Sequence, residues 1–151
     1  MKIKEIKVKD VMRKEVICAK EGTPMREVVR IITEKDISSL PILDKEDNLI
    51  GIISEKDLML KKEWFERFCM YDSFDAKNTM NSMVRILSNI AGRVMTKNVL
   101  TVGEEDSVCK PAKLMVEQRK NQLPVVKGKK IVGIITRKDI VALVAEETNV
   151  S

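Results

Sequence analysis

Hydrophobic and polar positions occur in the same order twice along the chain. In the first half, residues 16–19 form a short β-prone run, and an amphipathic stretch follows from Thr23-Pro24. A hydroxyl at the N-cap and a proline in the first turn are typical of a helix start, so we place Thr23 at the N-cap and Pro24 at the first helical position. The apolar positions of this helix recur at helical spacing, at Met25, Val28, Val29 and Ile32.

Two β-prone runs, residues 40–43 and 49–54, come next and are separated by a polar turn. Pro41 would open the first run, a position that tolerates proline. A further helix is predicted from Glu55, because Ser54 is a favourable N-cap residue. The first half therefore predicts the order strand, helix, strand, strand, helix.

The second half repeats this order. Moving residues 11–43 by 83 positions places them on residues 94–126, and residues 49–58 fall on 131–140 at an offset of 82. The single deletion lies in the polar turn between the two later strands, where length changes are tolerated. The two halves therefore predict two copies of one structural unit.

The second copy predicts strands at 99–102, 123–126 and 131–136, and a last helix from Arg137 to about Glu146. Pro124 would open its strand as Pro41 does. Pro111 lies about five residues into the expected first helix of this copy, so it should remove a hydrogen bond or delay the helix start.

Residues 59–90 connect the copies and contain all five aromatic residues of the chain. Leu60, Trp64, Phe68 and Tyr71 share one helical face, and a second amphipathic helix would end at Gly92. These stripes favour a helical connector packed on the repeats. A lid or a partner-docking surface rich in aromatic residues and methionine is the alternative.

Each copy is too small to stand alone easily, because about 50 residues with three strands leave one sheet face uncovered. Two copies packed about a pseudo-twofold axis would bury both faces. We therefore expect an α/β fold in which the copies form one pseudo-symmetric domain.

Composition agrees with a folded domain, because 44% of the 151 residues are hydrophobic. The chain has no run of 18 apolar residues and begins without an apolar signal region, so neither a transmembrane helix nor a secretory signal is expected. Three widely spaced cysteines, Cys18, Cys69 and Cys109, predict neither a disulfide framework nor a metal pair. A reducing cytoplasm is the expected compartment.

The inventory of reactive side chains argues against an enzyme. There is no histidine, which removes the commonest general base and the imidazole metal ligand. The motifs of nucleophilic, phosphate-binding and metal-dependent enzymes are also absent, so we expect no catalytic residue and no metal. The net charge of +5 arises from 28 basic residues interleaved with 23 acidic ones, which favours a solvated mixed-charge surface over a basic groove. The clustering of all aromatics in the connector disfavours nucleic-acid modules that stack bases, because these need aromatic residues along a basic groove.

One repeated stretch is the candidate functional site. Residues 51–57, Gly-Ile-Ile-Ser-Glu-Lys-Asp, return at 133–139 as Gly-Ile-Ile-Thr-Arg-Lys-Asp. The hydroxyl would cap a helix, and the aspartate would lie on the same face of its first turn, as in a variant capping box. A carboxylate can also accept hydrogen bonds from both hydroxyls of a cis-diol, and a helix start attracts anions. The pattern therefore allows helix capping alone or ligand binding.

The complete order resembles the CBS domain. Each copy has a V-M-x-x-x-V segment, an amphipathic helix, an L-P-hydrophobic-hydrophobic run and a G-I-I-[ST]-x-x-D run, and the pair resembles a Bateman module. The resemblance covers motifs at residues 8–58 and 90–146, joined by the 59–90 connector into one CBS-pair domain. It implies a β-α-β-β-α fold for each motif, and a disc-like homodimer.

The resemblance also implies two clefts, one or both of which hold an adenosine-containing ligand such as AMP, ADP, ATP or S-adenosylmethionine. No cofactor is required. The aspartate of one motif would bind the ribose hydroxyls, its hydroxyl residue and helix start would face the phosphates, and the other motif would supply an adenine slot. The first cleft would be lined by Met12, Ile17, Ile37, Ser38, Ser39, Thr136, Arg137, Lys138 and Asp139. The second would be lined by Met95, Leu100, Lys120, Asn121, Gln122, Ser54, Lys56 and Asp57. The small Ser38-Ser39 pair leaves more room for a base than the longer residues at 120–122.

Two functions follow as hypotheses. The first is a free-standing regulatory module that senses an adenosine nucleotide and passes a conformational change to an unknown protein effector. The second is a ligand-free structural or interaction module that acts through dimerisation and the aromatic connector.

Overall fold

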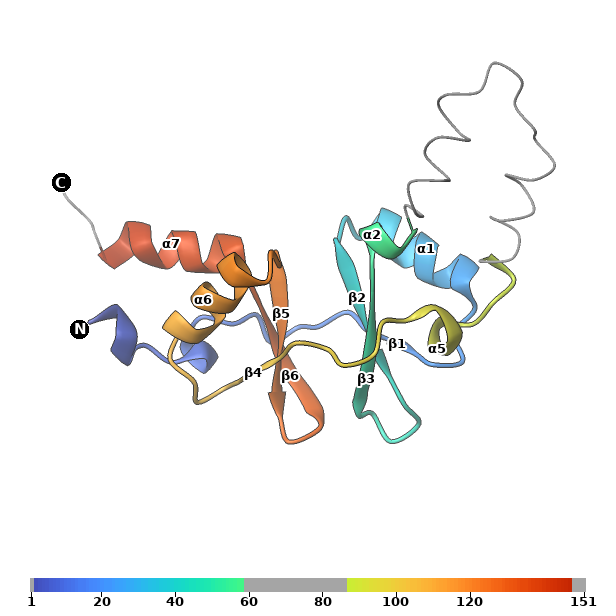
Figure 1. Ribbon diagram of the computed structural model, residues 1–151, viewed down its shortest axis with the longest axis horizontal. Coiled ribbons are helices and arrows are strands. Elements are labelled where there is room, and N and C mark those ends of the chain that lie inside the picture. The colour runs from blue at the N-terminus through green and yellow to red at the C-terminus, as the bar shows by residue number, and fades with distance from the viewer. Residues whose placement is uncertain (1, 59–86, 148–151) are drawn as a thin grey trace, which may run out of the picture. The chain divides into compact units, whose positions relative to one another are not determined.

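The computed structural model describes residues 2–58 and 87–147, which divide into two compact units (Figure 1). Unit 1 comprises Met1–Ile17 and Leu100–Ser151, and unit 2 comprises Cys18–Val99. Each unit thus combines the sheet of one repeat with the short leading segment of the other repeat. The aromatic part of the connector, and with it most of the two helices predicted there, lies outside the described residues.

Unit 2 contains a three-stranded sheet of order β1-β2-β3, in which β1 is parallel and β3 antiparallel to β2. Its elements follow the predicted order: β1 (Ala19–Lys20), α1 (Met25–Glu34), β2 (Ser39–Leu43), β3 (Leu49–Ser54), α2 (Glu55–Leu58) and α5 (Ala91–Val94). The predicted strand at 49–54 and the helix start at Glu55 are confirmed.

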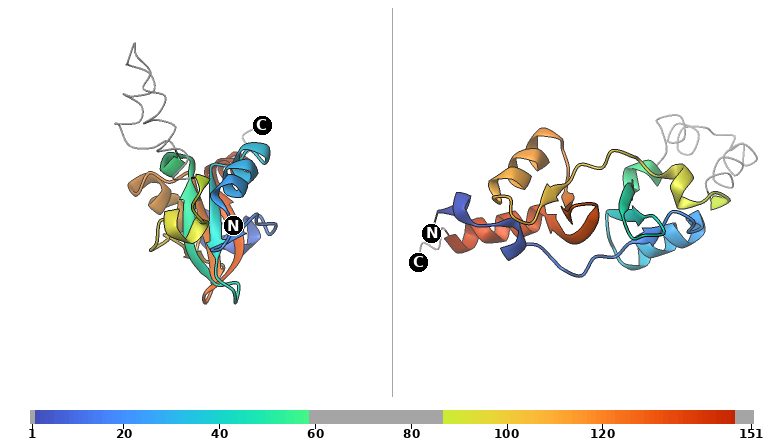
Figure 2. Two further views of the ribbon diagram at one scale, coloured as in Figure 1. Left: turned by 90° about the vertical axis from the view of Figure 1, so that its right-hand side faces the viewer. Right: turned by 90° about the horizontal axis from the view of Figure 1, so that it is seen from below.

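Unit 1 has the same sheet plan in β4-β5-β6. Its elements are two 3₁₀ turns, η1 (Ile3–Glu5) and η2 (Val8–Asp10), then β4 (Val102–Gly103), α6 (Cys109–Glu117), β5 (Gln122–Lys127), β6 (Lys130–Thr136) and α7 (Arg137–Glu147). Helices α6 and α7 pack against each other beside the sheet (Figures 1 and 2). The last helix was predicted correctly to within one residue.

The apolar periodicity predicts the core of each unit. In unit 2, Met25, Val28 and Ile32 of the α1 stripe are buried against the sheet residues Leu40 and Ile53. In unit 1, the equivalent cluster contains Val102, Met115, Leu123, Val125 and Ile135.

The predicted first strands at 16–19 and 99–102 are wrong in extent, because β1 begins at Ala19 and β4 at Val102. The prolines account for this. Pro41 and Pro124 do not open their strands but are the third residues of the central strands β2 and β5.

The nitrogens of these prolines face the edge strands. Pro41 is opposite Ile52, whose N–H donates to the Thr96 carbonyl 3.0 Å away and not to β2. In an antiparallel pair both members then direct their backbone groups away from each other, so Pro41 directs its nitrogen toward β1. Since proline has no N–H, pairing with β1 begins one position later, at Ala19 opposite Ile42.

Three helix boundaries also differ from prediction. Pro24, not Thr23, is the N-cap of α1, and the Thr23 hydroxyl instead accepts a hydrogen bond of 3.1 Å from the Lys20 N–H. Gly92 does not end a helix but lies inside α5, because Ile90 before it is extended and bridges Pro24. Pro111 acts as predicted, because α6 begins at Cys109, one position later than α1 does.

Helices α1 and α6 end in the same way. Asp36 and Arg119, two positions beyond the helices, have positive φ angles of 49° and 52°. The next N–H groups, of Ile37 and Lys120, donate back to Ile32 and Met115 at 3.2 and 3.0 Å, as in a Schellman motif. This turn directs the residues predicted to line the adenine slot toward the start of the central strand.

Candidate functional site

The repeated hydroxyl and aspartate lie at the junction between a strand and a helix in each unit. Ser54 is the last residue of β3 and Thr136 the last of β6, and a helix begins at the next residue. The Asp57 Oδ2 accepts hydrogen bonds from the Ser54 N–H at 2.8 Å and its hydroxyl at 3.0 Å. The Asp139 Oδ2 accepts one from the Thr136 N–H at 2.9 Å, and the Thr136 hydroxyl accepts from the Asp139 N–H at 3.2 Å. The predicted capping box is therefore confirmed in both copies.

Capping uses only one oxygen of each carboxylate. The Oδ1 of Asp139 is 3.3 Å from the Nε of Arg13, and the Oδ1 of Asp57 is 3.5 Å from the hydroxyl of Thr96. A carboxylate offers about four acceptor positions, so a cap leaves capacity for further donors. Helix capping and ligand binding are therefore compatible at these aspartates.

Arg13 and Thr96 are equivalent residues of the two leading segments, each following a methionine. The N–H and carbonyl groups of Arg13 exchange hydrogen bonds of 2.8 and 2.9 Å with Ile134, and Thr96 and Ile52 do so at 2.9 and 3.0 Å. Each leading segment is thus fixed beside the outer strand of the sheet in its unit. Sequence reasoning missed both residues, although their equal offset behind Met12 and Met95 was a usable signal.

The glycine of each motif is required by this arrangement. A Cβ atom on Gly133 would lie 2.5 Å from the Met12 sulfur and 2.9 Å from the Arg13 carbonyl oxygen. A Cβ on Gly51 would lie 2.3 Å from the Met95 sulfur. Both distances are too short for real contacts, so a larger residue would have to displace the methionine, and at Gly133 also the backbone of the leading segment.

The structure places the other predicted residues in one unit or the other. In unit 2, the Ser38 carbonyl accepts a hydrogen bond of 2.9 Å from the Glu55 N–H, so the residues before β2 lie beside the start of α2. In unit 1, the Asn121 carbonyl accepts one of 2.9 Å from the Arg137 N–H. Each predicted cleft combines residues of both units, and these combinations stay predictions.

The accessibility of the predicted residues varies. Ser39 is buried, with 8% of its surface exposed, whereas Lys120 and Asn121 are exposed. Ile17 is 40% exposed, which leaves an apolar surface available. The remaining hydrophobic residues of the predicted slots are half-buried: Met12, Ile37, Met95 and Leu100.

Exposed cations surround the start of α7. Arg137 and Lys138 are both exposed, and the Nε of Arg137 donates to the Lys120 carbonyl at 3.1 Å. At the start of α2 the equivalent positions are Glu55 and Lys56. The two half-sites therefore differ in charge although they share the same backbone plan.

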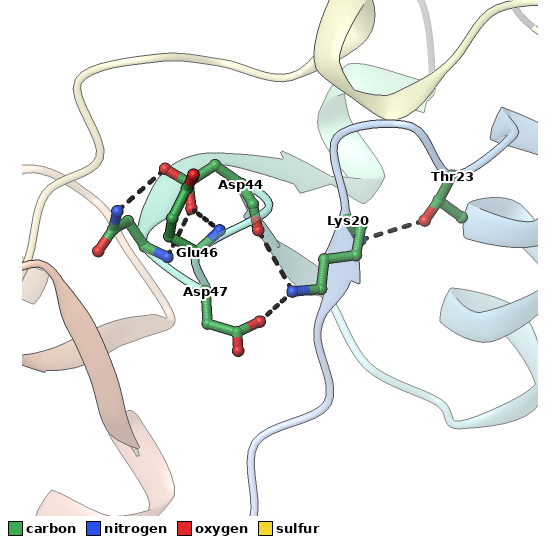
Figure 3. A network of polar contacts seen from close by, with 6 residues as sticks. Lys20, Thr23, Asp44, Glu46 and Asp47 are labelled. Atoms are coloured by element: carbon green, nitrogen blue, oxygen red, sulfur yellow. Dashed lines mark hydrogen bonds and ion pairs between the residues drawn. The ribbon is translucent and has the colours of Figure 1, made fainter.

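A surface pocket of about 700 Å³ lies elsewhere in unit 2, among Lys20, Glu21, Lys45, Ile90 and Arg93 with two glycines. It contains none of the residues predicted to bind a ligand. Lys20 at its edge is held by the β2–β3 turn, where its ammonium group pairs with Asp47 and donates to the Asp44 carbonyl at 3.2 Å (Figure 3). The network fixes the turn next to β1.

The thiol of Cys18 does not have the lowered pKa of a reactive centre. Burial raises the pKa of the Cys18 thiol to about 11, although nearby Lys20 opposes the shift. Within residues 2–58 and 87–147, no three histidine, cysteine, aspartate or glutamate side chains group as a metal site would require. In the same ranges, no helix is both long and apolar enough to cross a membrane.

The protein-family model of the CBS domain matches this chain twice, at residues 8–62 and 91–146. Homoserine O-acetyltransferase of Methanohalobium evestigatum is 26% identical over 140 residues, which cover 92% of this chain and 24% of the enzyme. A second curated relative is matched over 33% of its length. The chain thus spans about a quarter of the first relative and about a third of the second.

Two solved structures resemble the chain over nearly its whole length. The CBS domain pair of protein MJ0100, in complex with 5′-methylthioadenosine and S-adenosyl-L-methionine, has a TM-score of 0.70 and 27% identity, over 95% of this chain and 98% of that chain. CBSX2 in complex with AMP has a TM-score of 0.74 and 23% identity, with the same coverage. Because CBSX2 is only 23% identical to this chain, its likeness is evidence for the fold alone.

Proposed function

The chain belongs to the CBS domain family, and we propose that it is a regulatory module that binds an adenosine-containing ligand in one or both clefts and signals to a protein effector. The candidate ligands are AMP, ADP, ATP and S-adenosylmethionine. Catalysis is not part of this proposal, since a binding module needs only the acceptors and cations that the two half-sites supply.

The observation that carries the proposal is that one oxygen of each carboxylate caps a helix while the other oxygen is not used by the cap. Asp57 and Asp139 use Oδ2 to cap a helix, which fixes the side chain, and present Oδ1 away from the cap. A fixed carboxylate is suited to accept hydrogen bonds from ribose hydroxyls, because no side-chain entropy is lost on binding. The adenosine ligands of MJ0100, which is 27% identical, support the same ligand class.

Conservative variants test this role without removing the cap. In Asp57→Asn and Asp139→Asn the side-chain oxygen can still accept the capping hydrogen bond, but the new NH₂ group cannot accept from a ribose hydroxyl. Asp106→Asn is the matched control, because Asp106 also accepts a local backbone hydrogen bond, 2.7 Å from the Gly103 N–H, and is not a predicted ligand residue.

Isothermal titration with AMP, ATP and S-adenosylmethionine should show binding to the wild-type chain and to Asp106→Asn. Loss of the ribose contacts should weaken binding by about 10-fold or more in Asp57→Asn or Asp139→Asn, as expected for a charge-assisted hydrogen bond. If the folded wild-type chain binds none of the three ligands, the proposal is wrong.

We also propose that the chain forms a homodimer through α6 and α7. Val116 on α6 and Val141 on α7 are 78% and 66% exposed, and these helices pack side by side. Large apolar side chains on adjacent exposed helices are typical of an interface with a second copy. Light scattering should give a dimer mass for the wild-type chain and a monomer mass for Val116→Lys with Val141→Lys. A monomeric wild type at high protein concentration would contradict dimerisation.

A further inference from the structure

We propose that Arg13 makes the half-site at Asp139 selective for adenosine ligands that carry a phosphate, whereas the half-site at Asp57 favours neutral or sulfonium-bearing ligands. This inference rests on the proposed function, because it assumes that both aspartates bind ribose. It adds a specificity residue and a different ligand class for each half-site.

The position of Arg13 connects it to the ligand rather than to the fold. Its Nε contacts Oδ1 of Asp139, the oxygen that the helix cap does not use. The side chain of Arg13 is 60% exposed and that of Asp139 is 13% exposed. The guanidinium therefore lies on the solvent side of the carboxylate.

The ion pair is not what holds the leading segment in place. Its guanidinium is exposed, although its carboxylate is only 13% exposed. The leading segment is already held by its backbone hydrogen bonds to Ile134 and by the contact of Met12 with Gly133. In the described part of the chain the Arg13 side chain has no other hydrogen bond, so its remaining donors can meet a ligand.

Electrostatics makes this guanidinium selective. The 5′ substituent of an adenosine ligand is attached to the same ribose ring whose hydroxyls Asp139 would hold. Its charge therefore lies within the Debye length of about 10 Å from Arg13 at 0.1 M salt. A phosphate is attracted there, and a planar guanidinium also binds it through paired hydrogen bonds. A sulfonium is repelled.

The charged residues near the two aspartates differ in net sign. Arg13 contacts the carboxylate of Asp139, and the exposed Arg137 and Lys138 directly precede Asp139 in the chain, so three cations accompany one carboxylate. At Asp57 the equivalent positions are Thr96, Glu55 and Lys56, so one cation faces two carboxylates. Thr96 contributes only a neutral hydroxyl, 3.5 Å from Asp57, which is longer than an ordinary hydroxyl hydrogen bond. Over these three pairs of equivalent positions and the two aspartates, the net charge is thus positive at one half-site and negative at the other.

Exchanging the two equivalent residues tests the proposal. The Asp139 half-site is isolated in the Asp57→Asn background, and affinities are measured for AMP and for uncharged 5′-methylthioadenosine. Arg13→Thr, which installs the residue of the other repeat, should lower the preference for AMP by about 10-fold. Arg13→Lys keeps the charge and should retain most of the preference. In the Asp139→Asn background, Thr96→Arg should raise the preference for AMP.

The two proposals fail in different ways. If Arg13→Thr and Arg13→Lys both bind 5′-methylthioadenosine as the parent does and keep its preference for AMP, this inference is wrong and the proposed function stands. If no adenosine ligand binds the wild-type chain, both are wrong. A charge effect also requires the preference of the parent for AMP to fall as salt is raised, and a preference independent of salt would overturn the role of Arg13.

Discussion

The sulfur of Met12 packs against the backbone of Gly133, at a place where any larger residue would collide with it. A Cβ on Gly133 would lie 2.5 Å from this sulfur. Met95 and Gly51 form the equivalent pair in the other unit. In each motif the glycine therefore provides the space that a methionine of the other repeat occupies. This contact holds the leading segment next to the aspartate.

Gly133→Ala should destabilise the chain more than Gly51→Ala. The new methyl group at 133 would also meet the backbone oxygen of Arg13 at 2.9 Å, which cannot move without breaking the bridge to Ile134. At 51 all of the close atoms belong to the Met95 side chain, which has other rotamers. Overpacking of this kind costs about 1–3 kcal/mol. Urea unfolding of both variants would measure the difference, and equal losses would contradict it.

Shortening the methionine should relieve part of the clash. Met12→Ala removes the sulfur that lies closest to the new methyl group but leaves the Arg13 carbonyl in place. In a double-mutant cycle, Met12→Ala and Gly133→Ala should therefore be less destabilising together than the sum of the single variants. Strict additivity would show that the two residues do not compete for the same space.

Local patterns predicted the repeated elements well, because helix caps and strand composition act over a few residues. The order of elements, the strand at 49–54 and the capping boxes at Ser54 and Thr136 all follow from such patterns. The α1 stripe also predicted which residues are buried, since helical periodicity reports one face directly.

The errors arise where a distant segment determines the local structure. Pro41 lies inside β2 because Ile52, opposite it, bonds to Thr96 and not to β2, a relationship that no local pattern contains. Arg13 was missed for a similar reason, because its partner Asp139 is 126 positions away. Only the comparison of equivalent positions in the two repeats would have drawn attention to Arg13 and Thr96.

Arg119→Gly should stabilise the chain. Arg119 has a φ of 52° at the end of α6, a left-handed conformation that costs most residues about 1–2 kcal/mol and glycine almost nothing. Part of this gain is lost because glycine is more flexible in the unfolded chain, so a net gain of about 0.5–1 kcal/mol is expected. The control is Lys35→Gly at the C-cap of α1, where φ is −89° and glycine brings no relief. When thermal unfolding is measured, the melting temperature should rise only for Arg119→Gly. A decrease for that variant would refute the expectation.

Asp106 should make the chain more stable near neutral pH than in acid. A hydrogen bond from the Gly103 N–H, helped by Lys110, lowers the pKa of the Asp106 carboxyl below its ordinary value. Because this pKa is lower in the folded state, the stabilisation is present above the unfolded pKa and is lost as the pH falls through the folded pKa. Asp106→Asn should therefore cost about 1 kcal/mol at pH 7 and progressively less in acid. Urea unfolding at pH 7 and pH 3 tests this, and a difference that does not shrink in acid would contradict it.

Cys18 should resist alkylation at a pH where Cys109 reacts. Burial raises the Cys18 pKa to about 11 from the ordinary 9.0, whereas Cys109 is exposed. Below pH 9 this shift lowers the thiolate fraction of Cys18 by about 100-fold, and the thiolate is the reacting form. The raised pKa also means that the folded chain keeps a proton that the unfolded chain releases. Stability from this group is therefore complete below pH 9 and is lost as the pH rises toward 11.

Peptide mass spectrometry after brief iodoacetamide treatment at pH 8 should find Cys109 modified and Cys18 intact, with Cys18 becoming reactive on addition of urea. Equal labelling of the two cysteines in the folded chain would show that Cys18 is not protected by burial.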